Sequence, residues 1–150
     1  MSYWLLYRNP QYRIMVVAAT KRRAELFIMF VRRLLIEFPL LSHLKPKHSQ
    51  LDYLGMFDVA QALADQSPSV KAVDILGQLT SSRADFIISD DIEIPNNSAT
   101  QAARDKISEL MKELDAVLKP LSDAHIIYLG TKTEMTVYNS IAERSCKVRI

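Results

Sequence analysis

Short apolar runs alternate with longer helical patterns along the chain. Two segments carry apolar residues at the spacing of a helix, one from about Lys21 to Phe38 and one that ends before Pro120. Four brief apolar runs are predicted as buried strands, at residues 13–19, 69–76, 86–89 and 125–130. This alternation of strands and helices predicts an α/β protein whose parallel sheet is covered on both faces.

Local signals bound these elements. Thr20 is predicted as the N-cap of the first helix, and Ser98 with Gln101 fits a capping box before the second. The first helix is apolar nearly all round apart from its arginines, so we expect it to be buried or to pack on a partner. Trp4 and Tyr7 are expected in the core. Other segments are predicted as a loop (PLLSHLKPKHSQ), a short strand or hairpin (LDYLGMFDV), a short helix (TVYNSIAER) and the start of a last strand (KVRI).

The composition is that of one ordinary globular domain: 150 residues, of which 49% are hydrophobic and 24% charged. No apolar stretch reaches the roughly 20 residues of a membrane helix, so no membrane partner is expected. The single cysteine, Cys146, cannot form an internal disulfide. Charge is asymmetric, because residues 1–50 hold nine Lys or Arg against two Asp or Glu, whereas residues 51–150 hold ten against fifteen. The amino-terminal third is therefore predicted to have a basic face.

The stretch FIISDDIE places three carboxylates at the end of a predicted strand. Ligands of open α/β sheets bind at the carboxyl ends of the strands, where Asp90 and Asp91 are expected to lie. Mg²⁺ prefers oxygen ligands and needs only one or two protein carboxylates, and a neighbouring acid can orient or deprotonate an attacking water. The local pattern fits a metal or catalytic site, and it also fits a solvated strand end with an Asx turn.

Three longer strings carry a family resemblance. They are YRNPQYRIMVVAATKRRAELF, SPSVKAVDILGQLTSSRADFIISDDIEIPNNSAT and IIYLGTKTEMTVYNSIAER. Together they resemble the ATPase domain of the large terminase subunit, or DNA maturase B, of short-tailed phages, with shared order and spacing from about Tyr3 to Arg144. The resemblance implies a P-loop NTPase-like (ASCE type) α/β fold. It also implies a motor that uses ATP to drive double-stranded DNA into a preformed capsid in the host cytoplasm.

The resemblance implies roles for individual residues as well. Asp90 matches the Walker B aspartate that holds Mg²⁺ through water. Asp91 takes the place of the carboxylate that polarises the attacking water, with Glu93 as a less favoured substitute for that role. Gly130 and Thr131 lie in the string LGT, which resembles the coupling motif, and the Thr131 hydroxyl would sense the γ-phosphate.

Arg83 lies seven residues before Asp90, where an arginine finger could project into the site of the next subunit and stabilise transition-state charge. The alternative role of this arginine is a local ion pair with Asp85. Both interpretations stay open from the sequence.

Basic residues on the first predicted helix are candidates for contacts with DNA phosphates. They are Lys21, Arg22, Arg23 and Arg33, with Arg32 beside them. A basic helix edge can instead be solvated or face a neighbouring subunit. By resemblance, the partners are double-stranded DNA, other terminase subunits in a ring, the portal and the small terminase subunit.

A phosphate-binding loop of the form G-x-x-x-x-G-K-[ST] is absent from these residues, because their only glycines are Gly55, Gly77 and Gly130. The acids of the family's nuclease domain are missing too. We therefore expect residues 1–150 to form a partial ATPase domain, a fragment or split-gene product whose sheet lacks the P-loop strand and which needs a partner bearing the P-loop. Mg²⁺ and ATP would bind in the complete motor. Neither is expected to bind tightly to this chain alone, which should show no ATPase activity.

Two alternatives to the ATPase remain. Asp90, Asp91 and Glu93 could gather two metal ions as a nuclease, although no further acid cluster on another strand supports this. The chain could also be a non-catalytic module that assembles into a terminase ring and regulates it.

Overall fold

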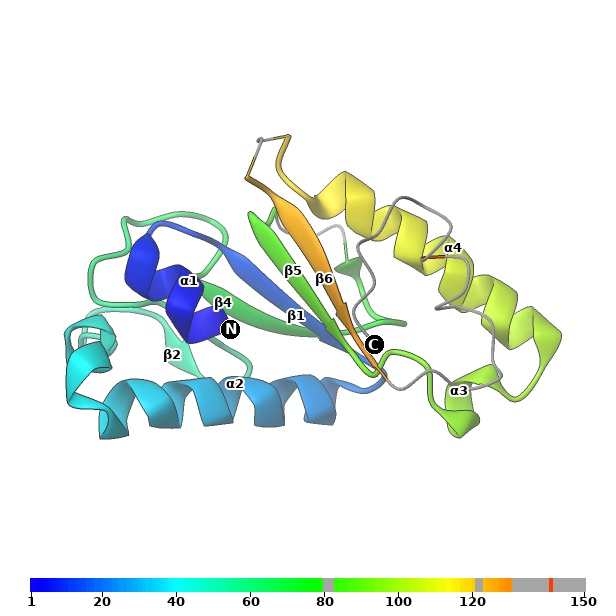
Figure 1. The fold of residues 1–150 in the computed structure, drawn as a ribbon, viewed down its shortest axis with the longest axis horizontal. Coiled ribbons are helices and arrows are strands. Elements are labelled where there is room, and N and C mark those ends of the chain that lie inside the picture. The colour runs from blue at the N-terminus through cyan, green and yellow to red at the C-terminus, as the bar shows by residue number, and fades with distance from the viewer. Residues whose placement is uncertain (80–82, 121–122, 131–140, 142–150) are drawn as a thin grey trace.

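A six-stranded sheet forms the centre of the molecule, with strands in the order β2-β3-β4-β1-β5-β6 (Figure 1). The computed structural model describes residues 1–79, 83–120, 123–130 and 141. In chain order the elements are α1 (Ser2–Arg8), β1 (Ile14–Ala18), α2 (Lys21–Glu37), the 3-10 helix η1 (Pro39–Leu44), β2 (Asp52–Tyr53), β3 (Met56–Phe57), β4 (Val70–Asp74), β5 (Phe86–Asp90), α3 (Pro95–Ser98), α4 (Gln101–Val117) and β6 (His125–Leu129).

The four long strands run in the same direction. β1 pairs in parallel with β4 on one side and β5 on the other, and β5 pairs in parallel with β6. The short strands β2 and β3 form an antiparallel hairpin beside β4. The α/β class, the parallel arrangement and the hairpin are therefore confirmed, and the P-loop NTPase-like type stays a prediction. Because the four strands are parallel, their carboxyl ends meet at one edge of the sheet.

Helices cover both faces of the sheet, with α2 on one side and α4 on the other (Figure 1). The side chains of β1 alternate between the two cores: Ile14, Val16 and Ala18 join the cluster under α2, whereas Met15 and Val17 join the one under α4. This explains why β1 is apolar without interruption, since every residue of a doubly covered strand is buried.

Helix α2 begins and ends where its sequence signals place it. The Thr20 side chain accepts a hydrogen bond from the Arg23 backbone N–H at 3.3 Å, and Phe38 is extended before Pro39. A stripe of four residues is buried against the sheet: Ala24, Ile28, Val31 and Leu35. The opposite face of the helix exposes apolar side chains such as Leu26 and Phe30.

Two predictions on local structure are wrong. Thr100, not Ser98, is the N-cap of α4, because Pro95 starts the separate short helix α3, which Ser98 ends. The Ser98 hydroxyl donates to the Ile94 carbonyl instead, at 2.8 Å. The segment PLLSHL forms η1 rather than a loop, because its proline stands at the first helical turn, where a missing N–H costs nothing.

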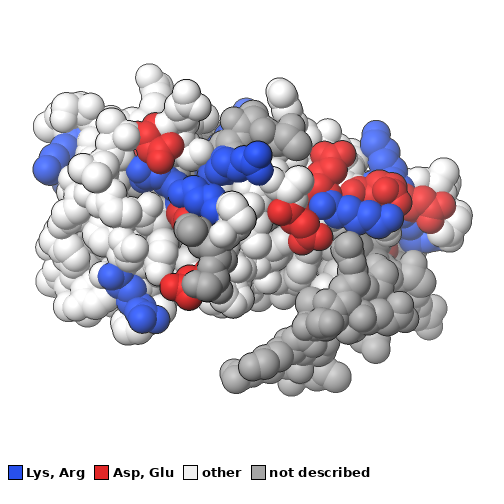
Figure 2. All heavy atoms as spheres, turned by 90° about the horizontal axis from the view of Figure 1, so that it is seen from above, with Lys and Arg blue, Asp and Glu red and all other residues white. Residues whose placement is uncertain are grey.

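The placement of Trp4 and Tyr7 in the core is also wrong. Their side chains are 54% and 39% exposed, and they stack on each other with ring centroids 5.9 Å apart. Helix α1 has only seven residues and buries mainly Leu6, so its aromatic residues remain on the surface. Figure 2 shows charged side chains of both signs gathered at the end of the molecule that carries α4, with further Lys, Arg, Asp and Glu side chains spread over the rest of this face.

The predicted helix TVYNSIAER and the strand KVRI lie outside the described residues, apart from Ile141, which is buried in the core under α4. None of the helices in the described part of the chain is long and apolar enough to cross a bilayer.

Candidate functional site

The carboxyl edge of the parallel sheet carries acids on two strands. Asp90 is the last residue of β5 and is half-buried. It pairs in register with Ala18, the last residue of β1, which pairs on its other side with Asp74 at the end of β4. Asp74 is not among the site residues predicted above, although an acid that ends a predicted parallel strand is the signal that could have identified it.

Asp91 turns sharply away from β5. Its φ of 45° lies in the left-handed region, which is uncommon for residues other than glycine but tolerated by Asp and Asn. The Asp91 backbone N–H donates to the carbonyl of Leu129, the last residue of β6, at 2.9 Å. The turn and this hydrogen bond fix the direction in which the carboxylate leaves the sheet.

Arg23, in the first turn of α2, pairs with Asp91. The guanidinium Nη2 lies 2.9 Å from Oδ2 of Asp91, and the side chains are 45% and 38% exposed. Arg23 is predicted from the sequence as a DNA contact and Asp91 as a catalytic residue, whereas the structure brings the two together. The topology brings the start of α2 to the acids, because α2 follows β1 directly and β1 pairs with β5.

The electrostatics of the edge favour a cation. Burial raises the pKa of Asp90, the charge of Asp91 raises it further, and the charge of Arg23 lowers it. Two adjacent carboxylates therefore compete to be ionised, and a bound cation would relieve that competition. The carboxylates of Asp90 and Asp91 therefore suit a metal ion that takes its other ligands from water or from a bound molecule.

The three acids of the sequence motif do not act as one cluster. Among the residues that the structure describes, no group of three His, Cys, Asp or Glu side chains could hold a metal ion. Both side-chain oxygens of Glu93 are shielded from solvent. The Asp74 carboxylate is folded over Gly77, where an added Cβ would come within 3.2 Å of its oxygens. Asp90 and Asp91 are thus the acids of this edge that are both adjacent and partly exposed.

Gly130 lies directly after β6 and is exposed. Its neighbour Leu129 pairs with Asp90 in the sheet and accepts the Asp91 hydrogen bond, so Gly130 stands at the same edge as the acids. Thr131 lies outside the described residues.

Arg83 lies at the opposite end of β5 from the acids. Its guanidinium Nη1 donates to the carbonyl of Ala116 near the end of α4, and its backbone N–H donates to Ser67 Oγ at 3.2 Å. The alternative role in a local ion pair is not what is found, because Asp85 contacts Lys119 instead, at 3.1 Å. Seven residues of extended chain correspond to about 23 Å, so Arg83 cannot act on the acids of its own chain.

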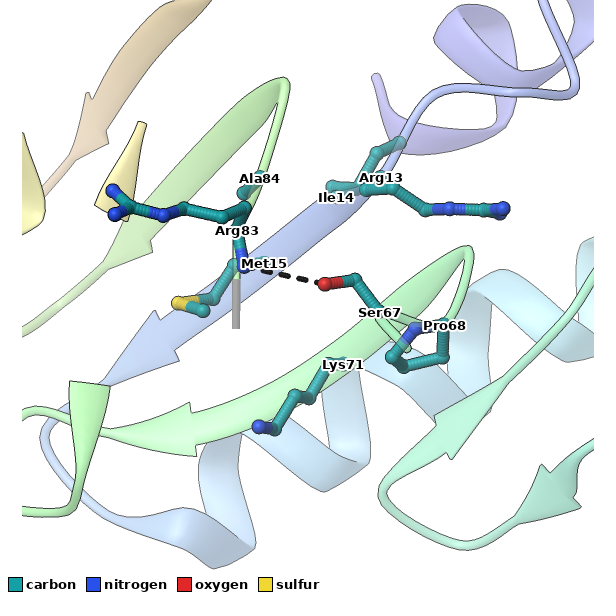
Figure 3. A pocket seen from close by; sticks show the side chains of 8 residues that line it. All are labelled: Arg13, Ile14, Met15, Ser67, Pro68, Lys71, Arg83 and Ala84. Atoms are coloured by element: carbon teal, nitrogen blue, oxygen red, sulfur yellow. Dashed lines mark hydrogen bonds between the residues drawn. The ribbon is translucent and has the colours of Figure 1, made fainter. Parts of the chain in front are cut away.

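A small pocket lies beside Arg83, and Figure 3 shows its lining. Arg13 and Arg83 point away from each other across it, and Lys71 extends from β4 below. The volume is about 10 Å³, which is room for about one water molecule. This pocket is not a nucleotide site.

The basic candidates on α2 divide into two groups. Lys21, Arg22 and Arg23 lie in the first turn, at the edge that carries the acids, and Lys21 and Arg22 have no ion-pair partner among the described residues. Arg33 lies near the other end of the helix and pairs with Glu37 at 2.6 Å. The structure therefore does not gather the four predicted DNA contacts at one place.

These features define an α/β protein with a mixed sheet. The carboxyl edge of its four parallel strands presents paired carboxylates beside the N-terminus of a helix. The chain is 51% identical over 141 residues to the large terminase subunit of Enterobacteria phage T3. The match covers 93% of this chain and 24% of the relative, so the chain spans about a quarter of the relative's length. The resemblance to a large terminase subunit is thereby confirmed over nearly the whole chain. A search of protein families finds no match.

Proposed function

We propose that this chain supplies the acidic edge of an ATP-hydrolysing motor that packages viral DNA. The observation that carries the proposal is the pair Asp90 and Asp91 at the carboxyl end of β5, in a chain that is 51% identical to a large terminase subunit over 93% of its length. The partly exposed carboxylates stand where α/β sheets bind their ligands.

Mg²⁺ fits the donor set at this edge. It is a hard cation that usually keeps several waters, takes one or two protein carboxylates and shares the phosphates of a bound nucleotide. The adjacent carboxylates of Asp90 and Asp91 support a cation at this place, because a positive charge relieves the repulsion between them. Asp90 would hold the ion through water, and the ion would neutralise part of the negative charge of the phosphates.

Asp91 is the proposed acceptor for the attacking water. A carboxylate that orients and deprotonates water must be held in one direction, and Asp91 is held by its left-handed turn and by Arg23. Glu93 is the reserve candidate for this role. Gly130, at the same edge, leads into Thr131, whose hydroxyl is the proposed sensor of the γ-phosphate.

The nucleotide phosphates need a phosphate-binding loop. These 150 residues lack one, because the motif G-x-x-x-x-G-K-[ST] does not occur in them. A segment or chain that bears a P-loop must therefore complete the site, giving it the P-loop NTPase-like character. In an assembled ring, Arg83 would reach the site of a neighbouring subunit from the far end of β5. Double-stranded DNA, the portal and the small terminase subunit are the proposed partners, and the infected host cell is the proposed place of action.

Phosphate release from ATP tests this proposal. The purified chain is assayed with Mg²⁺, alone and together with a P-loop-bearing segment of a large terminase subunit. We expect release above background only in the completed preparation, and its loss with Asp90→Asn. Asp105→Asn, which makes the same change on exposed α4, is the matched control and should retain activity. Glu93→Gln distinguishes the two candidate bases, because a loss with this variant and not with Asp91→Asn would assign the role to Glu93.

The non-catalytic assembly module is the competing outcome. It would be favoured if the chain bound the P-loop-bearing segment and no phosphate release followed. The nuclease alternative has no observation in its favour, since no metal-holding group of three acids exists in the described part of the chain.

A further inference from the structure

A polar groove lies between η1 and β2. It has a volume of about 590 Å³ and is lined by residues 45–53. This segment follows η1, which itself follows α2, whereas Arg23 and the acids stand at the first turn of α2 (Figure 1). A helix of 17 residues is about 25 Å long, so the groove is well separated from the acidic edge.

The Gln50 side chain joins the groove by hydrogen bonds to the segment that follows β3. Its side-chain oxygen accepts from the Lys47 backbone N–H at 2.9 Å, and its amide nitrogen donates to the Val59 carbonyl at 2.8 Å. The Gln50 backbone N–H donates in turn to the Lys47 carbonyl, at 2.9 Å. The segment is thus a shaped loop rather than a loose connection, and its side chains are presented in a fixed arrangement.

The charge of this groove is positive. Lys45, Lys47 and His48 are exposed, and none of them has an ion-pair partner within the described ranges. Asp52 is the only acid in the lining, and Arg32 neutralises it from α2 at 2.7 Å. The groove therefore keeps two uncompensated lysine charges, which attract an anion.

We propose that the groove of residues 45–53 binds the phosphate backbone of duplex DNA through Lys45 and Lys47. The identity of the anion rests on the proposed packaging function. The shape favours a polymer backbone over a nucleotide, because a small ligand is mostly enclosed by apolar walls, whereas this groove is open and its exposed lysines follow one another along a single loop. Tyr53, which is 66% exposed, offers a further contact to a sugar or phosphate.

Fluorescence anisotropy of a labelled duplex tests the proposal with the purified chain. Affinity is measured from about 50 to 200 mM salt, because each phosphate contact adds about one unit to the slope of log affinity against log salt. Lys45→Ala with Lys47→Ala should weaken binding to duplexes of unrelated sequence alike and should lower the slope by about two units. Lys45→Arg with Lys47→Arg should retain both the affinity and the slope.

Two control variants carry the same loss of charge elsewhere. Lys106→Ala with Lys112→Ala, on α4, should leave the slope unchanged. Lys21→Ala with Arg22→Ala tests the rival contact at the start of α2. An unchanged slope in the groove variant overturns the proposal, even where the Lys21 variant lowers the slope. Absence of DNA binding by the original chain overturns it as well. The result is independent of phosphate release, so a failed ATPase assay and a failed DNA assay identify different errors.

Discussion

Breaking the ion pair between Arg23 and Asp91 should have a small, measurable cost. The atoms are 2.9 Å apart, but both side chains are more than one-third exposed, and pairs of this exposure contribute about 0.2–1 kcal/mol. We expect the upper half of that range. The backbone of Asp91 is already fixed by its left-handed turn and its hydrogen bond to Leu129, so little further conformational entropy is lost.

A double-mutant cycle measures this coupling. Arg23→Gln, Asp91→Asn and the double variant are unfolded with urea, and the interaction energy is the departure from additivity. Asn tolerates the left-handed conformation as Asp does, so the Asp91 variant removes charge without adding backbone strain. For a chain of this length, 1 kcal/mol corresponds to a change in Tm of about 2–4 °C. The coupling should decrease in high salt.

The pair between Arg33 and Glu37 is the internal comparison. Its side chains are 72% and 51% exposed and it lies within one helix, where such pairs contribute about 0.3–0.5 kcal/mol. A coupling at Asp91 that is zero, or smaller than this one, would refute the inference that Arg23 holds the carboxylate in place.

Three further changes test the fold and the site. Ile88→Ala should lower the free energy of unfolding by about 2–5 kcal/mol in urea, because Ile88 is fully buried in the core under α2, and a cost below 1 kcal/mol would contradict that placement. The pKa of Asp90 in the folded protein is raised above its ordinary value of 3.8. The ionised carboxylate therefore disfavours the folded state, and the free energy of unfolding falls as the pH rises from the ordinary pKa through the raised one. Asp90→Asn should therefore raise stability at neutral pH in metal-free buffer, by less than about 1 kcal/mol because the site is partly exposed, and a lower Tm would contradict this sign. The isolated chain should self-associate through exposed apolar residues such as Phe30, which is 60% exposed, and light scattering should show less association with Phe30→Lys; a clean monomer of the original chain at tens of micromolar would count against this.

The sheet could be predicted from the sequence because short runs of apolar residues mark its strands. A strand covered on both faces has to be apolar throughout, as residues 14–18 are, and parallel neighbours bring their carboxyl ends to one edge. The position of Asp90 at that edge followed directly. The side-chain partners could not be derived in the same way. The pairing of Arg23 with Asp91 depends on a left-handed turn, and hydrophobic spacing carries no information about such a turn.

The errors have physical causes as well. Hydrophobicity alone predicts Trp4 and Tyr7 in the core, but a helix of seven residues can bury only one side against its neighbours. The spacing of Ser98 and Gln101 predicts Ser98 as the cap of the long helix, but Pro95 favours an earlier helical start, which leaves the capping role to Thr100. In each case tertiary packing or a nearby proline decided between local signals of similar strength.

In the proposed function, Asp91 acts in the chemistry and not in nucleotide binding. The most direct test measures nucleotide affinity and phosphate release in the same preparation, with the P-loop-bearing segment present and Asp91→Asn compared with the original chain. We expect the variant to bind ATP with nearly the original affinity and to release no phosphate, because the amide keeps the size of the carboxylate but cannot accept the proton. Phosphate release by the Asp91→Asn variant at the original rate would contradict the account. So would robust hydrolysis by the 150-residue chain without a P-loop.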